Sequence, residues 1–356
     1  MVSMSKFLCG AVAALDPYTP GEQPRDMQYI KLNTNESPFP PSPRVVEALN
    51  EEERRKLRLY SDPTCKELVD AIAARYGLRP GQVLAGNGSD ENLAFAFRAF
   101  CDGERGPAYA DITYGFYKVW AKLWDLPALA VPLREDFSLD VEDYMDLDAT
   151  LFIANPNAPT GMAVPVRDIR RLLERDPGRV VVVDEAYVDF GTESCVPLLG
   201  EFDNLLVVQT FSKSRSLAGA RLGFALGSEA LIDDLNRIKY SFNPYNINRL
   251  SILAGKAAME DEAYFQACTG AIRETRAWTA AALKELGFQV LPSSANFLFV
   301  RAEKCGGEAL YRGLKERGIL VRWFGTDRIR DFVRVTIGAQ KDMETLVSTL
   351  KDMLEV

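Results

Sequence analysis

Three apolar runs in the middle of the sequence constrain the fold more than any other feature. They span residues 149–154 (ATLFIA), 179–187 (RVVVVDEAY) and 204–210 (NLLVVQT). None of them shows the alternation of apolar and polar residues that a strand with one solvent face carries. Such runs are typical of parallel strands that helices cover on both faces. Because helical patterns surround them, we expect an α/β fold with a mostly parallel central sheet and right-handed crossovers.

The regions around these runs extend the alternation of helices and strands. A helix is expected from Ser42 through the charged run EEERRK, a strand is expected at QVLAG, and further helical patterns are expected at 64–77, 89–101 and 229–238. After residue 245 the order changes to a long helix over 248–286, followed by the strands and helices of an α+β unit. We therefore expect three parts: an N-terminal arm at 1–40 that joins the small domain, a large domain at 41–245, and a smaller C-terminal domain at 246–356.

The composition excludes several classes of function. The net charge of −8 argues against a nucleic-acid partner, and no stretch reaches the roughly 18 apolar residues of a membrane span. The six cysteines are scattered without CxxC spacing, which argues against a metal site and a disulfide framework. We expect a soluble, cytoplasmic protein. Because the chain has no histidine, proton transfer must use Lys, Tyr, Asp, Glu or Cys.

Polar residues follow several of the expected strands, at the edge where open α/β sheets bind ligands. After QVLAG, Ser89 or Asp90 can cap a helix whose free backbone N–H groups face an anion, although ordinary turns look similar. Asp184 follows the valine run, either as an ion-pair partner or cap, or as the partner of a cationic ring nitrogen. Lys213 and Arg221 follow the third run. A lysine there is either a solvated loop residue or, with a lowered pKa, a Schiff-base former.

Together these residues make the set that pyridoxal phosphate requires. A lysine holds the cofactor aldehyde, and a carboxylate keeps the pyridine nitrogen protonated so that the ring accepts electrons. A helix N-terminus and an arginine suit the phosphate, and Tyr114 in DITYGFY offers an aromatic ring for stacking. We therefore expect pyridoxal phosphate as the cofactor.

The sequence also resembles a known family over nearly its whole length. The matching segments, in chain order, are PYTPG, KLNTNESP, LYSDPTCKEL, GNGSDE, TYGFY, NPNAPTG, VVDEAYVDF, TFSKSRSLAGARLGF and FVRVTIG. The pair VDEAY and SKSRSLAGARLGF is specific for the fold-type I pyridoxal-phosphate aminotransferases, and the full series is similar to the histidinol-phosphate aminotransferase family. The resemblance implies a large domain with a mostly parallel sheet and a smaller α+β domain.

The resemblance implies a role for each matching residue. Lys213 forms the Schiff base with the cofactor and moves the substrate's α-proton. Asp184 pairs with the pyridine nitrogen, Tyr187 bonds the ring oxygen, and Tyr114 stacks on the ring. The phosphate is held by Ser89, Asp90, Ser212 and Arg221, with Tyr60 reaching across from the neighbouring subunit of a homodimer with shared sites.

One segment departs from the family pattern. The family often has asparagine just before the proline of NNPTG, where it touches the ring oxygen, and this chain has Ala158 there with Asn157 one position earlier. Either Asn157 takes over through a shifted turn, or Tyr187 acts alone.

By the same resemblance the substrates are small anionic molecules. Arg334 would grip the carboxylate of glutamate and, in the other half-reaction, the phosphate of L-histidinol phosphate, because its fork binds either group. Arg322 is a second candidate, or else a surface arginine, and Tyr18 is expected to close over the site.

The expected reaction converts L-histidinol phosphate and 2-oxoglutarate to imidazole-acetol phosphate and glutamate. The alternatives are an aromatic or broad-range aminotransferase, a threonine-phosphate decarboxylase, and a non-catalytic ligand-binding protein. A dehydrogenase is disfavoured because the full GxGxxG fingerprint is missing.

Overall fold

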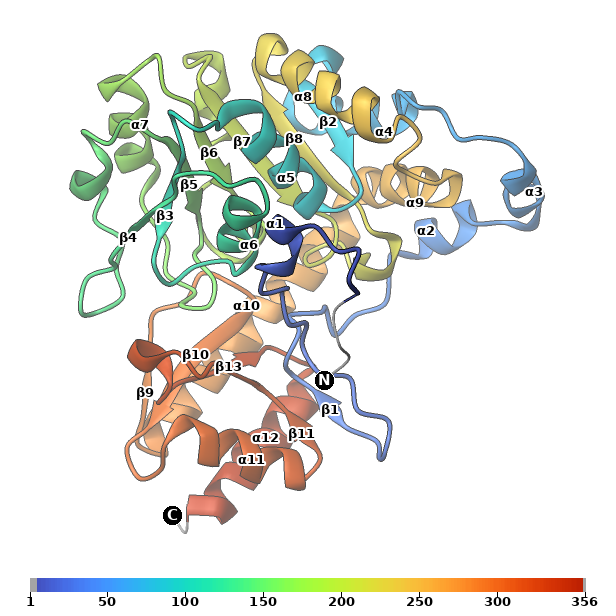
Figure 1. The fold of residues 1–356 in the computed structure, drawn as a ribbon. Coiled ribbons are helices and arrows are strands. Elements are labelled where there is room, and N and C mark those ends of the chain that lie inside the picture. The colour runs from blue at the N-terminus through green and yellow to red at the C-terminus, as the bar shows by residue number, and fades with distance from the viewer. Residues whose placement is uncertain (1–4, 355–356) are drawn as a thin grey trace.

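The largest sheet of this computed structural model, which describes residues 5–354, confirms the predicted mostly parallel α/β architecture (Figure 1). Within those residues its seven strands are, in spatial order, β2 (Val83–Gly86), β8 (Gly223–Gly227), β7 (Leu205–Thr210), β6 (Val181–Asp184), β5 (Thr150–Ala154), β3 (Pro107–Ala110) and β4 (Leu129–Val131). Strand β8 runs antiparallel to both of its neighbours, and the other six strands share one direction. The amino end of β8 therefore meets the carboxyl ends of the other strands at one edge.

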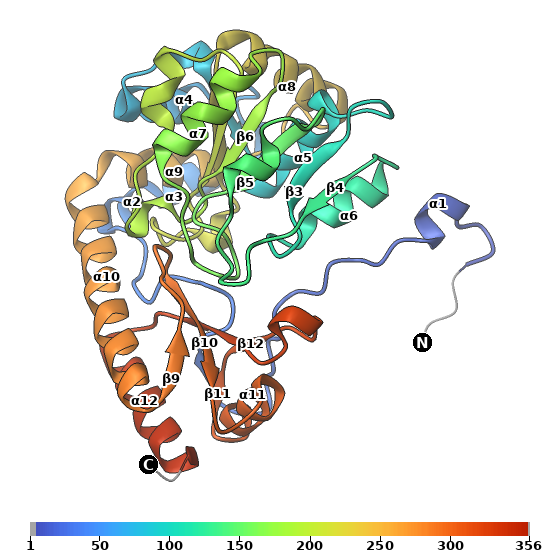
Figure 2. The same ribbon diagram turned by 90° about the vertical axis from the view of Figure 1, so that its left-hand side faces the viewer.

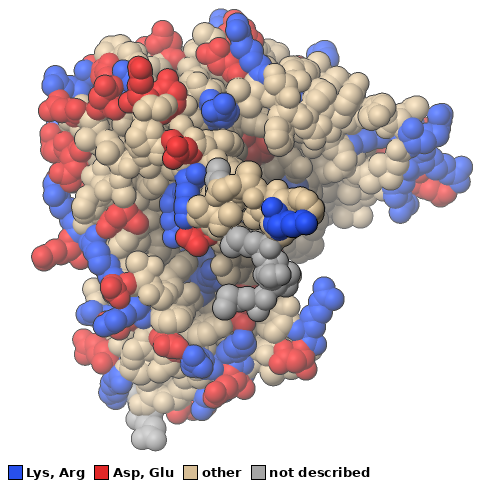
Figure 3. Space-filling view, in the orientation of Figure 1, with Lys and Arg blue, Asp and Glu red and all other residues tan. Residues whose placement is uncertain are grey.

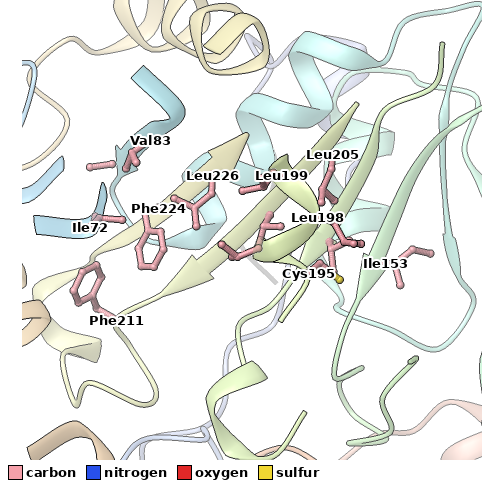
Figure 4. Close-up of a cluster of buried hydrophobic side chains, with 14 of the residues drawn as sticks. Ile72, Val83, Ile153, Cys195, Leu198, Leu199, Leu205, Phe211, Phe224 and Leu226 are labelled. Carbon is pink, nitrogen blue, oxygen red and sulfur yellow. The ribbon is translucent and has the colours of Figure 1, made fainter. Parts of the chain in front are cut away.

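The three apolar runs became β5, β6 and β7, and every residue of these strands is buried. Alternate residues pack into two different cores, with Val181 and Val183 on one face of the sheet and Val182 on the other. Figure 4 shows part of the first core, where Leu205 and Leu226 point from the sheet toward neighbouring side chains. Burial on both faces explains why the runs show no alternation of apolar and polar residues.

Helices supply the two cores with their apolar faces. One face of the sheet is covered by α5 (Ser89–Phe100), α6 (Phe116–Leu123) and α8 (Glu229–Phe242). The other face is covered by α4 (Lys66–Tyr76), α7 (Val166–Arg175) and α9 (Arg249–Glu260) (Figure 2). The apolar residues of these helices recur at helical spacing, which is why the sequence pattern located α4, α5 and α8.

The C-terminal part of the chain forms a second, antiparallel sheet. Its four described strands are, in order, β12 (Arg322–Trp323), β13 (Val333–Thr336), β10 (Phe297–Ala302) and β9 (Phe288–Val290). Around it lie α10 (Glu262–Glu285), α11 (Gly307–Glu316) and α12 (Gln340–Leu354). A short strand from the N-terminal segment, β1 (Ile30–Lys31), pairs in parallel with β11 (Ile319–Leu320).

Two expected helices are interrupted. The long helix expected over 248–286 is divided at Asp261, whose side chain accepts the backbone N–H of Tyr264 and so caps α10. The first piece, α9, packs against α4 and against α2 (Pro43–Ala48). The domain boundary near residue 245 stays a prediction. The helix expected from Ser42 onward is likewise two helices, α2 and α3 (Glu51–Arg55), because Asn50 caps the second one.

The N-terminal arm runs between the two sheets. It contains α1 (Gly10–Ala13) and is tied to the C-terminal unit through Glu22, which bonds Lys315 and Tyr311. Basic and acidic side chains are interspersed over the face seen in Figure 3. Among residues 5–354, no helix combines the length and the apolar character needed to cross a bilayer.

Candidate active site

Lys213 lies three residues beyond the end of β7, at the edge where the strand ends meet. Its Nζ atom donates a hydrogen bond to Thr34 O at 3.2 Å and lies 5.9 Å from the ring centroid of Tyr187. Burial lowers the pKa of Lys213 to about 8, and the positive charges of Arg334 and Arg221 act in the same direction. A substantial fraction of this lysine is therefore neutral near physiological pH, as a nucleophile or a proton acceptor must be.

Asp184 is the last residue of β6 and is almost completely buried. Its carboxylate accepts hydrogen bonds from Tyr117 OH at 2.9 Å and from the backbone N–H of Ala186 at 3.1 Å. Burial raises the pKa of Asp184 to about 6, and these two hydrogen bonds oppose that effect. The group is thus mostly ionised at neutral pH, and it suits a cationic partner. Sequence reasoning missed Tyr117, although it lies one helical turn beyond Tyr114 in TYGFY.

The amino end of α5 forms an anion-binding cradle. Its N-cap residue is Gly88, with a φ of +86°, and no side chain caps the helix, so the expected cap at Ser89 or Asp90 is wrong. Arg221 approaches from the start of β8, with its guanidinium within 3.5 Å of Ser212 Oγ and 3.4 Å from the carboxylate of Asp90. The predicted phosphate residues Ser89, Asp90, Ser212 and Arg221 are therefore brought together. Free N–H groups at a helix N-terminus beside an arginine favour a dianion.

Tyr114 lies between this cradle and the N-terminal arm. Its hydroxyl donates to Asp90 Oδ1 at 2.6 Å, which fixes the ring. Tyr18 of the arm stacks on Phe116 with ring centroids 4.3 Å apart, and its ring lies 6.4 Å from that of Tyr114. The arm thus places Tyr18 beside the ring that is predicted to stack on the cofactor.

Tyr187 and Asn157, which lies in the turn after β5, are the two candidates for binding the cofactor's ring oxygen, and they differ in their hydrogen bonds. The hydroxyl of Tyr187 accepts a hydrogen bond from Asn35 Nδ2 at 2.9 Å. The amide of Asn157 is engaged elsewhere: Nδ2 donates to Thr160 Oγ1 of the same turn and to Ile112 O in the loop after β3, and Oδ1 accepts from Thr113 of that loop. Both amide hydrogens of Asn157 are therefore in use. This arrangement favours the second sequence alternative, in which Tyr187 acts without an asparagine from this turn.

Arg334 enters the site from β13 of the smaller sheet. Its Nη2 atom donates to Asn33 O at 3.0 Å, and its Nε atom is buried without a hydrogen-bond partner among residues 5–354. The guanidinium lies 5.3 Å from the ring centroid of Phe297 and 5.6 Å from that of Phe324. Burial lowers the pKa of Arg334 below the usual arginine range. An unpaired guanidinium N–H in an apolar wall is ready for an anionic ligand.

Two predicted residues have other contacts in this chain. The guanidinium of Arg322 donates to Thr19 O at 3.0 Å and to Pro20 O at 3.2 Å, so it holds the arm. Tyr60 is 80% exposed and stacks on Tyr245 with ring centroids 4.6 Å apart. The substrate role of Arg322 and the cross-subunit role of Tyr60 stay predictions.

Comparison with known proteins decides the family. A family model described as aminotransferase class I and II matches residues 27–350. A histidinol-phosphate aminotransferase from Brachyspira hyodysenteriae is 49% identical over 353 residues, which cover 99% of this chain and 100% of that protein. One from Clostridium acetobutylicum is 47% identical over 351 residues, with 99% and 100% covered. The chain belongs to the histidinol-phosphate aminotransferase family.

A solved structure agrees with the fold of this aminotransferase. The crystal structure of histidinol-phosphate aminotransferase from Sinorhizobium meliloti in complex with pyridoxal-5'-phosphate superposes with a TM-score of 0.88. It is 22% identical and covers 100% of this chain and 99% of that one. At this identity the likeness concerns the fold, which is fold-type I as the sequence predicts.

The site of the aminotransferase fits pyridoxal phosphate. Lys213 suits the aldehyde, Asp184 suits a cationic ring nitrogen, and the α5 N-terminus with Arg221 suits the phosphate. The backbone of β8 also packs so closely against the amino end of α5 that only glycine fits at position 223. A Cβ atom on Gly223 would lie 2.2 Å from Ser89 N, so a side chain there would push the amino end of α5 away.

Proposed function

We propose that this enzyme transfers the amino group of L-histidinol phosphate to 2-oxoglutarate with pyridoxal phosphate as cofactor. The products are imidazole-acetol phosphate and glutamate. One observation carries the proposal: a lysine with a pKa of about 8 lies within the electrostatic influence of the partly buried Arg334, whose Nε is unpaired among residues 5–354. The first group suits amine and proton chemistry, and the second suits an anionic substrate.

The six cysteines are free thiols, which suits the reducing cytoplasm in which we place the enzyme.

When bound, pyridoxal phosphate supplies an electron sink for the electron pair that remains when the substrate's Cα–H bond breaks. Lys213 would hold the cofactor through Nζ, and its neutral amine, once released, would accept the proton from the substrate's Cα and later return it. Asp184, ionised and oriented by Tyr117, would keep the ring nitrogen protonated. Ser89, Asp90, Ser212 and Arg221 would hold the phosphate, and Tyr114 would stack on the ring. Tyr187 would donate its hydroxyl hydrogen to the ring oxygen.

Arg334 would bind the anionic end of both substrates in turn. Its planar fork matches a phosphate as well as a carboxylate, so one residue serves the two half-reactions. The aromatic rings of Phe297 and Phe324 exclude water from the guanidinium and strengthen the attraction. Arg322 would act through the arm, because its bonds to Thr19 and Pro20 hold Tyr18 against the site.

We further propose that two copies of the chain form a homodimer with shared active sites. The segments that carry Tyr60 and its stacking partner Tyr245, together with α2, expose large apolar side chains that a free monomer would leave in water, namely Val46, Leu57, Leu59, Tyr240, Phe242 and Tyr245. Exposed aromatic and aliphatic residues are characteristic of the core of a permanent interface. Figure 1 shows α3 and the adjoining chain extending away from the large sheet, where a second copy can pack. Tyr60 would then reach the phosphate in the partner's site.

Subunit mixing tests the shared site. In a heterodimer of Lys213→Ala and Tyr60→Ala chains, one site carries both defects and the other carries neither. Random mixing should therefore recover about a quarter of the wild-type activity from two nearly inactive homodimers. No recovery, with heterodimers verified by mass spectrometry, would place Tyr60 in the site of its own chain.

A substrate panel tests the reaction. Purified holoenzyme is offered L-histidinol phosphate, aromatic amino acids or L-threonine phosphate, each with 2-oxoglutarate. We expect the highest kcat/KM with L-histidinol phosphate and stoichiometric glutamate. Preference for the aromatic amino acids would indicate a broad-range aminotransferase, and release of carbon dioxide from L-threonine phosphate would indicate the decarboxylase.

A further inference from the structure

Three consecutive residues of the N-terminal segment contact three residues of the active site. Asn33 O accepts a hydrogen bond from Arg334 Nη2 at 3.0 Å, and Thr34 O accepts one from Lys213 Nζ at 3.2 Å. Asn35 Nδ2 donates to Tyr187 OH at 2.9 Å. The segment follows β1, which pairs with β11 of the smaller unit, so its position is fixed by the fold. It therefore forms a common support for groups that come from both sheets.

Asn35 is bonded through every polar atom it has. Its backbone N–H donates to Thr336 Oγ1, whose own hydroxyl donates to Asn35 Oδ1, each at 3.0 Å. Its backbone carbonyl accepts from Asn296 Nδ2 at 3.0 Å. The residue is 1% exposed and has a φ of +56°, a conformation that asparagine tolerates better than most residues. The position thus requires tolerance of positive φ together with a donor and an acceptor.

The Thr336 contact fixes the orientation of the Asn35 amide. Thr336 Oγ1 accepts the backbone N–H of Asn35 and donates its own hydrogen to Oδ1, and in this orientation of the amide Nδ2 faces Tyr187. The Tyr187 hydroxyl accepts that bond and keeps its own hydrogen for donation. A phenol that accepts a hydrogen bond becomes a stronger donor itself.

The turn after β5 supplies no hydrogen bond to the Tyr187 hydroxyl among residues 5–354. Ala158 is buried beside Ala295 and Phe297, and Tyr187 packs against this apolar cluster. Both amide hydrogens of Asn157 are used by Thr160 and Ile112. The amide that bonds the Tyr187 hydroxyl comes instead from Asn35 of the N-terminal segment.

We propose that Asn35 is a positioning residue that acts through Tyr187 on the bound cofactor, by directing the phenol hydrogen to the cofactor's ring oxygen. The inference rests on the role proposed above for Tyr187. When the nitrogen that links Lys213 to the cofactor is unprotonated, the ring oxygen carries a negative charge. A hydrogen bond to that oxygen stabilises this unprotonated form. Loss of the bond favours the protonated linkage, so the pH midpoint of the cofactor's absorbance change rises.

The test is a spectroscopic pH titration of the holoenzyme without substrate. Asn35→Gly keeps the positive φ without strain and removes the amide, and it should raise the midpoint by about 0.5 to 1 pH unit. Tyr187→Phe should raise the midpoint at least as much, and Asn35→Gly should add nothing in that background. Asn33→Ala is the matched control, because it removes an amide from the same segment whose partner is Glu22 O rather than Tyr187. Its midpoint should equal that of the wild type.

Each other outcome has a definite meaning. If Asn35→Gly shifts the midpoint equally with and without Tyr187, or does not shift it at all, Asn35 does not act through the phenol and the inference is overturned. If Tyr187→Phe itself leaves the midpoint unchanged, the proposed role of Tyr187 is wrong. Should the glycine variant not fold, Asn35→Asp keeps the acceptor for Thr336 and the tolerance of positive φ. Its carboxylate would accept the Tyr187 hydrogen, so it should raise the midpoint as well.

Discussion

Arg334→Lys tests the anion site most sharply, because it keeps the positive charge and removes the planar fork. In the wild type, one nitrogen of the fork bonds Asn33 O at 3.0 Å, and Nε has no partner among residues 5–354. A lysine lacks the planar fork and cannot bond Asn33 O and the substrate's anionic group in the same geometry. At least one charge-assisted hydrogen bond to the substrate is therefore lost. Such a bond contributes about 1.5–3 kcal/mol, which corresponds to a fall of roughly 10- to 150-fold in kcat/KM.

The assay follows each half-reaction separately, by the absorbance change of the bound cofactor in single turnovers. Because one arginine is assigned to both substrates, the fall should be similar with L-histidinol phosphate and with glutamate. Arg301→Lys is the control: Arg301 is an exposed residue of β10, and its variant should stay within about twofold of wild type. A fall in only one half-reaction would refute the shared role of Arg334, and no fall in either would refute the anion site.

Three further outcomes follow from the structure. Asp184→Asn should keep the absorbance of the lysine-bound cofactor but lower kcat roughly 100-fold, because a neutral amide cannot hold the ring nitrogen protonated; an unchanged kcat would contradict this role. Gly223→Ala should weaken cofactor affinity in an absorbance titration by roughly 5- to 150-fold, since its Cβ would lie 2.2 Å from Ser89 N. Gly219→Ala is the control and should leave the affinity unchanged, because a Cβ atom there would meet no atom within 4 Å. Uptake of pyridoxal phosphate by apoenzyme should accelerate as the pH rises through about 8, since the neutral amine of Lys213 attacks the aldehyde. A rate that keeps rising through the ordinary lysine pKa would show that burial does not shift this group.

The sequence predicted those features that depend on local pattern. The apolar runs located β5, β6 and β7, because burial on both faces removes polar residues from a strand altogether. Strand ends then placed Asp184 and Lys213 at one edge, since parallel strands share the direction of their carboxyl ends. The local sequence pattern was therefore enough to predict that Asp184 and Lys213 lie at the same edge of the sheet.

Features that depend on distant contacts were not predictable in this way. The contact between Asn35 and Tyr187 joins residues 152 positions apart, and no periodicity marks it. The break between α9 and α10 depends on Asp261, whose carboxylate both caps α10 and accepts from Ser42 of another segment. The contacts of Arg322 with the arm were equally beyond reach of the sequence, because Thr19 and Pro20 lie some three hundred residues earlier in the chain.

The most direct test of the proposed function is the visible absorption spectrum of the purified enzyme before and after addition of L-histidinol phosphate without a keto acid. The account predicts a band from the lysine-bound cofactor that is replaced by the band of the aminated cofactor, and that returns when 2-oxoglutarate is added. A band that L-histidinol phosphate leaves unchanged would contradict the proposed substrate. If no band forms even with added pyridoxal phosphate, the roles proposed for Lys213 and Asp184 are wrong.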